Sequence, residues 1–586
     1  MTAAEQPQAT PEATSSPAAE QPQATPEATS SPAAAQVSQS LMLLPPRRKL
    51  AILGAILLTL FLASLDQTVV GTALPRIITD LNGANLYAWV VTAYLLTSTI
   101  TVPIYGKFSD VFGRKVMLMI GVCIFLFGSW LSGASQNMTE LVLFRAIQGL
   151  GAGALFPIVI ATIADLYSPR ERGRFQGLFG AVFGLSFIVG PFLGGWITDH
   201  ISWHWVFYVN VPFGIASLIV LWTTLPGIGR RTASPRDLDY LGIVVFTAGV
   251  VPLMVGLSNK GFVNSSGQLP NWTDLKVGGL IVLGIVILVG FVLVELRAKE
   301  PIIPLALFRG RDYSVSMAAV FVFGVAMFAA VLFMPRFYQT VRGISATASG
   351  YYIWPLLVGL MGGSIGSGLL ISRLGRYKWL MVGGAAVMVI GGYLLTRITA
   401  DISDWTLWAY MLVLGFGIGP SMAGFTVVVQ NSVPINRLGV ATSTLTFLRQ
   451  IGASVGLAVA GTVFSTQFAN RLPHTLAAHG VPQQAIPQLV KLSELLQSVG
   501  NGRSVLERIF TGPEAVLIPK VIAGANEALA LAIGDLFWVT FIAAVLGLSF
   551  TLMLRDRPLR SAREIRAEAS GVQMDPAQQP AAELGA

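Results

Sequence analysis

Long apolar stretches constrain the fold of this chain more than any other feature of its sequence. An apolar helix of about 20 residues crosses the hydrocarbon core of a bilayer. Fourteen such stretches follow one another along the chain. They lie near Leu50–Leu74, Leu86–Tyr105, Val116–Gly133, Leu141–Ala164, Phe175–Ile197, Trp205–Leu225, Leu241–Leu257, Val277–Leu296, Tyr313–Phe337, Gly350–Ile371, Trp379–Leu395, Trp405–Val429, Leu438–Phe464 and Leu531–Leu554. The sequence therefore predicts an all-α, multi-pass membrane protein.

The charged residues are too few to cover a soluble protein. They make up 11% of the chain, against 53% hydrophobic residues, whereas soluble domains carry about a quarter charged residues. The net charge of +9 does not indicate a nucleic-acid partner, because the basic residues fall at the ends of the apolar stretches.

The distribution of basic residues predicts the orientation. An even number of spans places both termini on one side, and loops on that side hold 25 Lys and Arg residues against 6 in the short loops opposite. Basic residues favour the cytoplasmic side. We therefore expect both termini in the cytoplasm and the chain in the plasma membrane, the inner membrane of a bacterium.

A loop motif occurs twice with the same spacing: Gly106, Gly113 and Arg114, then Gly368, Gly375 and Arg376. Each copy follows the second span of a group of six, which predicts two homologous six-helix bundles with two inserted helices. Many secondary transporters are built from such repeats. The expected parts are a cytoplasmic tail (1–49), an N-terminal bundle (50–225), an inserted helix pair with its linker (226–311), a C-terminal bundle (312–554) containing an extracytoplasmic segment (465–530), and a second cytoplasmic tail (555–586).

Two regions are expected to lie outside the spans. Residues Ala3–Pro17 are repeated without change by Ala18–Pro32, and a tail rich in Pro, Ala, Thr and Gln without aromatic residues predicts disorder. In the outer segment, residues 489–500 and 504–510 have the pattern of short amphipathic helices. The sequence assigns neither region a function.

Several motifs in the right order carry a family resemblance. They are LDQTVVGTALP (Leu65–Pro75), GKFSDVFGRK (Gly106–Lys115), LFRAIQGLGAG (Leu143–Gly153), GLSFIVGPFLGG (Gly184–Gly195), WHWVFYVNVP (Trp203–Pro212) and VQNSVP (Val429–Pro434). The chain resembles the major facilitator superfamily, and specifically its fourteen-helix drug:proton antiporter family, over about Leu50 to Leu554. The resemblance implies the major facilitator fold and proton-coupled multidrug efflux.

Asp66 lies inside the first predicted span, roughly 25 Å from its inner end. Carboxylates within the membrane are costly and usually functional. A low dielectric favours the neutral acid, which suits a proton carrier. We expect Asp66 to couple transport to protons, although a fixed structural pair with a basic residue is the alternative.

Arg145 is the expected partner of Asp66. It lies roughly 10 Å inside the outer end of the fourth span, so both groups occupy the outer half of the membrane. Because arginine does not deprotonate, it would hold Asp66 or an anionic substrate. A structural arginine bonded to helix carbonyl groups remains the alternative.

The first loop motif and the fifth span suggest moving parts. The resemblance implies an inner gate at Gly106, Asp110, Gly113 and Arg114, whose charges pair across the two bundles in the outward-open state; a solvated loop that only sets topology is the alternative. In the second copy Ser372 replaces the acid, so any gate is asymmetric.

In the fifth span, Gly190, Pro191, Gly194 and Gly195 allow a hinge and close helix packing. Pure packing is compatible with that function.

Candidate cavity residues come from the C-terminal bundle. Arg449 lies near the membrane midplane, followed by Gln450, and an unpaired charge there should face a cavity or another helix. Tyr352, Trp354 and Phe425 are candidate apolar lining, with ordinary packing as the alternative.

The tenth and thirteenth spans lack the carboxylates of some family members, which argues against dicationic substrates and leaves neutral, monocationic or lipid-like ones.

The leading hypothesis is a proton-driven exporter of amphipathic or lipophilic small molecules, and not an enzyme. An exporter of an endogenous lipid or secondary metabolite remains open, while a membrane enzyme, a receptor or a sugar importer is less favoured. No phosphate-binding GxxxxGK[ST] motif occurs, so ATP-driven pumping is unsupported. We expect no cofactor or metal, a monomer, and small molecules, protons and lipid as the partners.

Overall fold

The structure is a computed structural model that describes residues 44–81, 86–227, 238–261, 270–491 and 516–559. Within these residues, fourteen helices are long and apolar enough to cross a membrane. They are α2 (Pro46–Asp80), α3 (Tyr87–Phe112), α4 (Arg114–Gly133), α5 (Met138–Leu166), α6 (Pro169–His200), α7 (Trp205–Tyr208) continued by α8 (Asn210–Thr224), α9 (Tyr240–Gly261), η2 (Leu275–Gly279) continued by α10 (Leu280–Glu295), α11 (Arg311–Thr340), α13 (Trp354–Leu374), α14 (Lys378–Leu395), α15 (Asp404–Ser432), α16 (Leu438–Ala478) and α20 (Ile518–Leu552). The predicted all-α fold with fourteen spans is confirmed.

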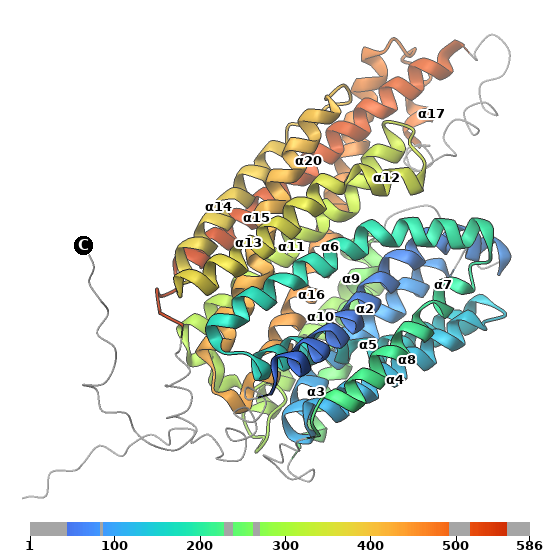
Figure 1. Cartoon of the computed structure of the whole chain (residues 1–586). Helices are drawn as coiled ribbons and strands as arrows, with labels where there is room; N and C mark the ends of the chain where they lie inside the picture. Colours follow the sequence, from blue (N-terminus) through green and yellow to red (C-terminus); the bar gives the residue numbers. More distant parts are fainter. Residues whose placement is uncertain (1–43, 82–85, 228–237, 262–269, 492–515, 560–586) are drawn as a thin grey trace, which may run out of the picture.

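The helices form two bundles (Figure 1). Helices α2 to α8 pack together, as do α11 to α20, while the inserted helix α9 lies beside α3 and α16 and α10 packs on α9. Phe246 of α9 contacts both Phe291 of α10 and Phe447 of α16, with each pair of ring centroids 5.2 Å apart. The inserted pair therefore lies against both bundles through α9, where α3 meets α16.

The repeated loop motif has the same backbone feature in both copies. Gly113, between α3 and α4, has a φ of 95°, and Gly375, after α13, has a φ of 67°. Side chains disfavour this left-handed region, so glycine is needed at each turn. Both turns lie at the same end of the molecule, which we call the inner end because the basic residues predict it to be cytoplasmic; the opposite end is the outer end.

The outer segment differs from the prediction. Helix α16 continues to Ala478 and α20 begins at Ile518, well beyond the expected ends of the thirteenth and fourteenth spans. Phe468, Leu472 and Leu476 extend the buried stripe of α16 at helical spacing, and burial of this stripe favours continued helix. Segment 465–530 is thus in part a continuation of two spanning helices, with Arg471 paired to Asp535 between them at 2.6 Å.

Other predicted features are met only in part. The short helix α17 (Ile486–Lys491) overlaps the first predicted amphipathic stretch. The second stretch and the N-terminal repeat lie outside the described residues.

In the tenth span, α12 (Ala346–Tyr352) precedes α13, which begins with Trp354 and Pro355. Proline favours the first turn of a helix and cannot continue a preceding one, so this span starts later than predicted.

Large apolar side chains remain exposed on the outside of the bundles. On α10, Val282, Val286 and Val289 are each about 60% exposed. A soluble monomer rarely leaves such a continuous apolar face to water. The exposed face of α10 is therefore suited to contact with lipid.

Candidate functional site

Asp66 is at the centre of a buried polar cluster in the N-terminal bundle. Its Oδ2 pairs with Nη1 of Arg145 on α5 at 2.6 Å. Its Oδ1 accepts hydrogen bonds from the side-chain amides of Gln148 on α5 at 2.8 Å and Asn210 on α8 at 3.1 Å. The predicted Asp66–Arg145 contact is therefore present, and both side chains are almost completely buried.

Arg145 makes several contacts besides the ion pair. Its guanidinium donates to the carbonyl oxygen of Val90 on α3 at 3.3 Å and to Oε1 of Gln148 at 2.7 Å. It also lies over the ring of Tyr94, 4.2 Å from the centroid. A buried ion pair is tolerated when hydrogen bonds satisfy its remaining groups, and this cluster meets that condition while joining α2, α3, α5 and α8.

Two members of this cluster were not identified from the sequence. Gln148 and Asn210 both belong to motifs that carry the family resemblance, but neither was singled out. The available signal was their polarity, because an amide inside an apolar span needs a hydrogen-bond partner. Asp66 supplies that partner to both.

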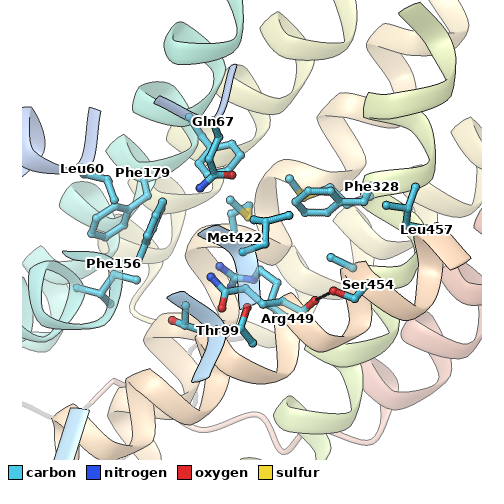
Figure 2. Close-up of a pocket in the computed structure, with 17 residues that line it drawn as sticks. Leu60, Gln67, Thr99, Phe156, Phe179, Phe328, Met422, Arg449, Ser454 and Leu457 are labelled. Atoms are coloured by element: carbon cyan, nitrogen blue, oxygen red, sulfur yellow. Dashed lines mark hydrogen bonds between the residues drawn. The ribbon is translucent and has the colours of Figure 1, made fainter. Parts of the chain in front are cut away.

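A cavity lies between the two bundles at the level of these residues. It encloses about 950 Å³ of empty space, part of it open to solvent. Figure 2 shows its lining, which comes from α2, α3, α5 and α6 on one side and from α11, α15 and α16 on the other. Most of the lining is aromatic or aliphatic. Such apolar cavities with a few polar groups are typical of small-molecule sites.

Asp66 is behind the wall of this cavity and does not line it. The neighbouring residue Gln67 lines it instead, whereas the Asp66 side chain is fully buried within the N-terminal bundle. Because successive side chains of a helix point about 100° apart, α2 presents Gln67 to the cavity and Asp66 to Arg145. Asp66 is therefore next to a cavity-lining residue along α2 but points away from the cavity.

Arg449 and Gln450 line the cavity, as predicted. Arg449 is eleven residues into α16, about 16 Å from its inner end, and so near the midplane. Its Nη2 and the Oε1 of Gln450 are buried without a hydrogen-bond partner among the described residues. None of the ion pairs of the described residues involves Arg449.

The structure does not bring the three predicted aromatic residues to the cavity. Tyr352 packs against Tyr338, with ring centroids 4.7 Å apart, and Trp354 is 44% exposed. Phe425 is fully buried against Phe323 inside the C-terminal bundle. Their packing within that bundle keeps them from the cavity.

The aromatic lining comes from four other residues: Phe156, Phe179, Phe183 and Phe328. Phe179 and Phe183 lie four residues apart, a spacing that places two side chains on one face of a helix. This spacing could have identified Phe179 and Phe183 from the sequence as neighbours on one helix face.

At the inner end, the first loop motif joins the two bundles. Oδ1 of Asp110 accepts a hydrogen bond from the backbone N–H of Gly439 at 3.1 Å, and its Oδ2 accepts one from Val440 at 2.9 Å. Both donors are at the amino end of α16, where free N–H groups favour an anion. Arg114 bridges Asp110 at 2.6 Å and Asp165 at 3.1 Å. Asp165, directly after an apolar stretch, was not identified from the sequence.

Gly106 allows this approach. A Cβ atom there would overlap Ser443 of α16. In the second copy, Gly368 of α13 likewise faces Gly173 of α6, so each first glycine of the motif packs against the other bundle. The charges differ, because Arg376 pairs with the exposed Asp556 at 3.4 Å and makes no comparable contact across the bundles among the described residues. This asymmetry agrees with the loss of the acid at Ser372.

The four residues proposed as a hinge lie within α6. Cβ atoms added at Gly190 and Gly194 would overlap Thr68 and Thr72 of α2, which is the tight helix contact that was predicted. Pro191 faces Gly350 of the C-terminal bundle, and Gly195 is buried. Helix α6 is continuous through all four residues.

Comparison with known proteins assigns the family. The model of the Major Facilitator Superfamily matches residues 56–457. The multidrug transporter protein MdtP of Bacillus subtilis (strain 168) is 35% identical over 516 residues, which cover 87% of this chain and 93% of that protein. The acurin A biosynthesis cluster MFS-type transporter of Aspergillus aculeatus is 32% identical over 433 residues, covering 72% and 77%.

A solved structure shares the fold. The proton:xylose symporter XylE superimposes with a TM-score of 0.52 at 14% identity, over 89% of this chain and 99% of that one. At this identity the likeness concerns the fold alone. Together with the match of the family model over residues 56–457, it shows that this chain has the fold of the superfamily. The chain belongs to the Major Facilitator Superfamily and is a membrane transporter, not an enzyme.

Proposed function

We propose that this transporter exports amphipathic or lipophilic small molecules in exchange for protons, by exposing one cavity alternately to the two sides of the membrane. The observation that carries the proposal is the largely apolar cavity between the two bundles, with a buried carboxylate one residue behind its wall. The name of the Bacillus relative, a multidrug transporter, supports the same class of substrate.

Proton coupling would act through Asp66. Protonation removes the negative charge that faces Arg145, and it weakens the hydrogen bonds from Gln148 and Asn210, since bonds to charged groups are about twice as strong as neutral ones. The contacts that hold α2 to α5 and α8 then become weaker. Because Gln67 and Leu60 of the same helix line the cavity, a shift of α2 changes the cavity wall and so the affinity for substrate.

Gating would act through α16. The backbone N–H of Gly439 donates to Asp110 of the N-terminal bundle, and ten residues further on the same helix presents Arg449 to the cavity. Breaking the Asp110 contact frees the inner end of α16 to move. Substrate at Arg449 and closure at Asp110 therefore act on one rigid element, which alternating access requires.

The proposal places the chain in the plasma membrane, the bacterial inner membrane, with both termini in the cytoplasm. The inner end would then face the cytoplasm, and contact between the bundles at Asp110 would close that side. A single chain supplies both bundles and the cavity, so we propose a monomer surrounded by lipid.

A second candidate is export of an endogenous lipid or secondary metabolite. It is favoured by the Aspergillus relative, whose name places it in a biosynthesis cluster. The same cavity and gate would serve this function.

Transport by the purified protein in proteoliposomes tests the main proposal. A panel of fluorescent lipophilic compounds is offered with and without an imposed pH gradient. We expect accumulation against the substrate gradient only when the pH gradient is present. Accumulation that is equal in both conditions would exclude proton exchange, and no movement of any compound would leave the metabolite exporter as the better hypothesis.

A further inference from the structure

Among the residues that the structure describes, a single ionisable side chain lines the cavity. Arg449 is the only charged residue of its lining within the described chain, and the polar remainder consists of neutral amides and hydroxyls. No carboxylate from the described residues lines it. An arginine stays protonated, so the cavity carries one positive charge near the midplane of the membrane, where a charge is costly.

The acidic residues that could have neutralised this charge are engaged elsewhere. Asp66 pairs with Arg145, and Asp110 and Asp165 pair with Arg114. Further along the chain, Asp535 pairs with Arg471. The described part of the protein therefore gives Arg449 no counter-charge, and its buried Nη2 has no hydrogen-bond partner.

The rest of the cavity is suited to an apolar body. Phe156, Phe179 and Phe183 form its wall on the N-terminal bundle, and the rings of Phe156 and Phe183 are 6.2 Å apart. Phe328 and Met422 lie on the other bundle, with Arg449 among them (Figure 2). Aromatic groups bury large areas and favour offset or edge contacts with one another.

We infer that the cavity selects amphipathic organic anions with an aromatic body, whose carboxylate or sulfonate pairs with Arg449 while the body packs among the phenylalanines. The inference rests on the proposed function and names its substrate class. A guanidinium binds a planar carboxylate through two parallel hydrogen bonds. A cation of the same shape meets a like charge with no carboxylate to offset it, which selects against it.

Three probes that share one body test the charge preference: pyrenebutyrate, its primary amide, and pyrenebutylamine. Equilibrium binding to the full-length protein in nanodiscs is measured by pyrene fluorescence, with empty nanodiscs subtracted. We expect the acid to bind at least tenfold more tightly than the amine, with the amide between them. Equal or tighter binding of the amine overturns the inference, and this comparison needs no variant.

Variants then test whether the charge preference in binding depends on Arg449. Arg449→Gln should weaken acid binding about tenfold and leave amide binding within twofold, while Arg449→Lys keeps part of the acid preference. Arg397→Gln, which removes an exposed positive charge in an outer turn, is the matched control and should change neither. Loss of acid binding in Arg397→Gln, or unchanged acid binding in a folded Arg449→Gln protein, contradicts the assignment to the cavity.

The outcomes separate this inference from the proposed function. If a pH gradient drives uphill movement of neutral or cationic compounds while the acid shows no preference for Arg449, the exporter stands and the anion selectivity fails. If the acid binds through Arg449 but no compound moves in response to a pH gradient, the selectivity stands and proton exchange fails.

Discussion

Asp110 of α3 accepts a hydrogen bond from the backbone N–H of Gly439, the second residue of α16, at a distance of 3.1 Å. The two residues belong to different bundles and are both buried. A Cβ atom at Gly439 would meet Oδ1 of Asp110 at 2.6 Å. The carboxylate can therefore reach the helix end only because residue 439 has no side chain.

Asp110→Asn should favour opening of the inner end. An amide oxygen still accepts a hydrogen bond but loses the charge, and bonds to charged groups contribute about 1.5–3 kcal/mol. We expect the conformational equilibrium to shift roughly 10- to 100-fold, with slower transport and retained substrate binding. Binding and transport rates are measured on the same purified protein.

Gly439→Ala should slow transport in the same way, because the added methyl group would overlap Oδ1 of Asp110 and so disturb the same contact. Asp556→Asn is the control, because its partner Arg376 is 64% exposed and such surface pairs contribute little. An Asp110→Asn protein that loses substrate binding, or one that binds substrate and still transports it at the normal rate, would contradict the gate.

Gly190→Ala should disturb the contact between α6 and α2. The added methyl group overlaps Thr68, and overpacking of this kind costs about 1–3 kcal/mol. We expect a lower melting temperature in detergent and slower transport. Gly71→Ala is the control, since a Cβ atom there meets no other atom within 4 Å. Equal melting temperatures for the two variants would argue against a packed hinge at Gly190.

The orientation can be checked by cysteine labelling. Cys123 is the one cysteine of the chain, so it is replaced by Ser and single cysteines are introduced at exposed sites. Gln483→Cys should react with an impermeant maleimide added to intact cells, and Arg373→Cys only after the membrane is broken. The physical basis is the excess of basic residues in the loops predicted to be cytoplasmic. Labelling of both from outside would refute the topology.

The apolar stretches predicted the number of spans because a lipid environment leaves the backbone little alternative to a helix. Helix ends outside the membrane were less predictable. The extension of α16 through Leu472 and Leu476 depends on burial against α20, which is a long-range contact. The turn glycines Gly113 and Gly375 were visible from the repeat, since a positive φ restricts the residue type.

The candidate site was likewise only partly predictable from the sequence. A charge inside a span, such as Asp66 or Arg449, stands out in the sequence because its burial is costly. Which of them reaches the cavity depends on the rotation of each helix, and this rotation places Gln67 on the cavity wall in front of Asp66. Aromatic residues occur in every span, so composition did not distinguish Phe183 from Phe425.

Asp66→Asn tests proton coupling. The asparagine keeps the size of the side chain, and its one carbonyl oxygen can accept a hydrogen bond from either Arg145 or Gln148, but it cannot bind or release a proton. We expect the variant to reach the membrane and to fail to build a substrate gradient from a pH gradient, while downhill exchange continues through an intact cavity. Asp66→Glu should keep partial activity with a shifted pH optimum. Uptake into proteoliposomes measures all three properties.

Removing one partner of a buried ion pair also leaves the other charge uncompensated, at a cost of about 3–5 kcal/mol. The double variant Asp66→Asn with Arg145→Gln removes both charges and should therefore fold better than the single variant, yet remain uncoupled. Asp535→Asn is the matched control, because its pair with Arg471 at the outer end is partly exposed and plays no part in the proposed coupling. If Asp66→Asn pumps uphill at the normal rate while Asp535→Asn does not, the coupling carboxylate is in α20 and the Asp66–Arg145 pair only holds the N-terminal bundle together.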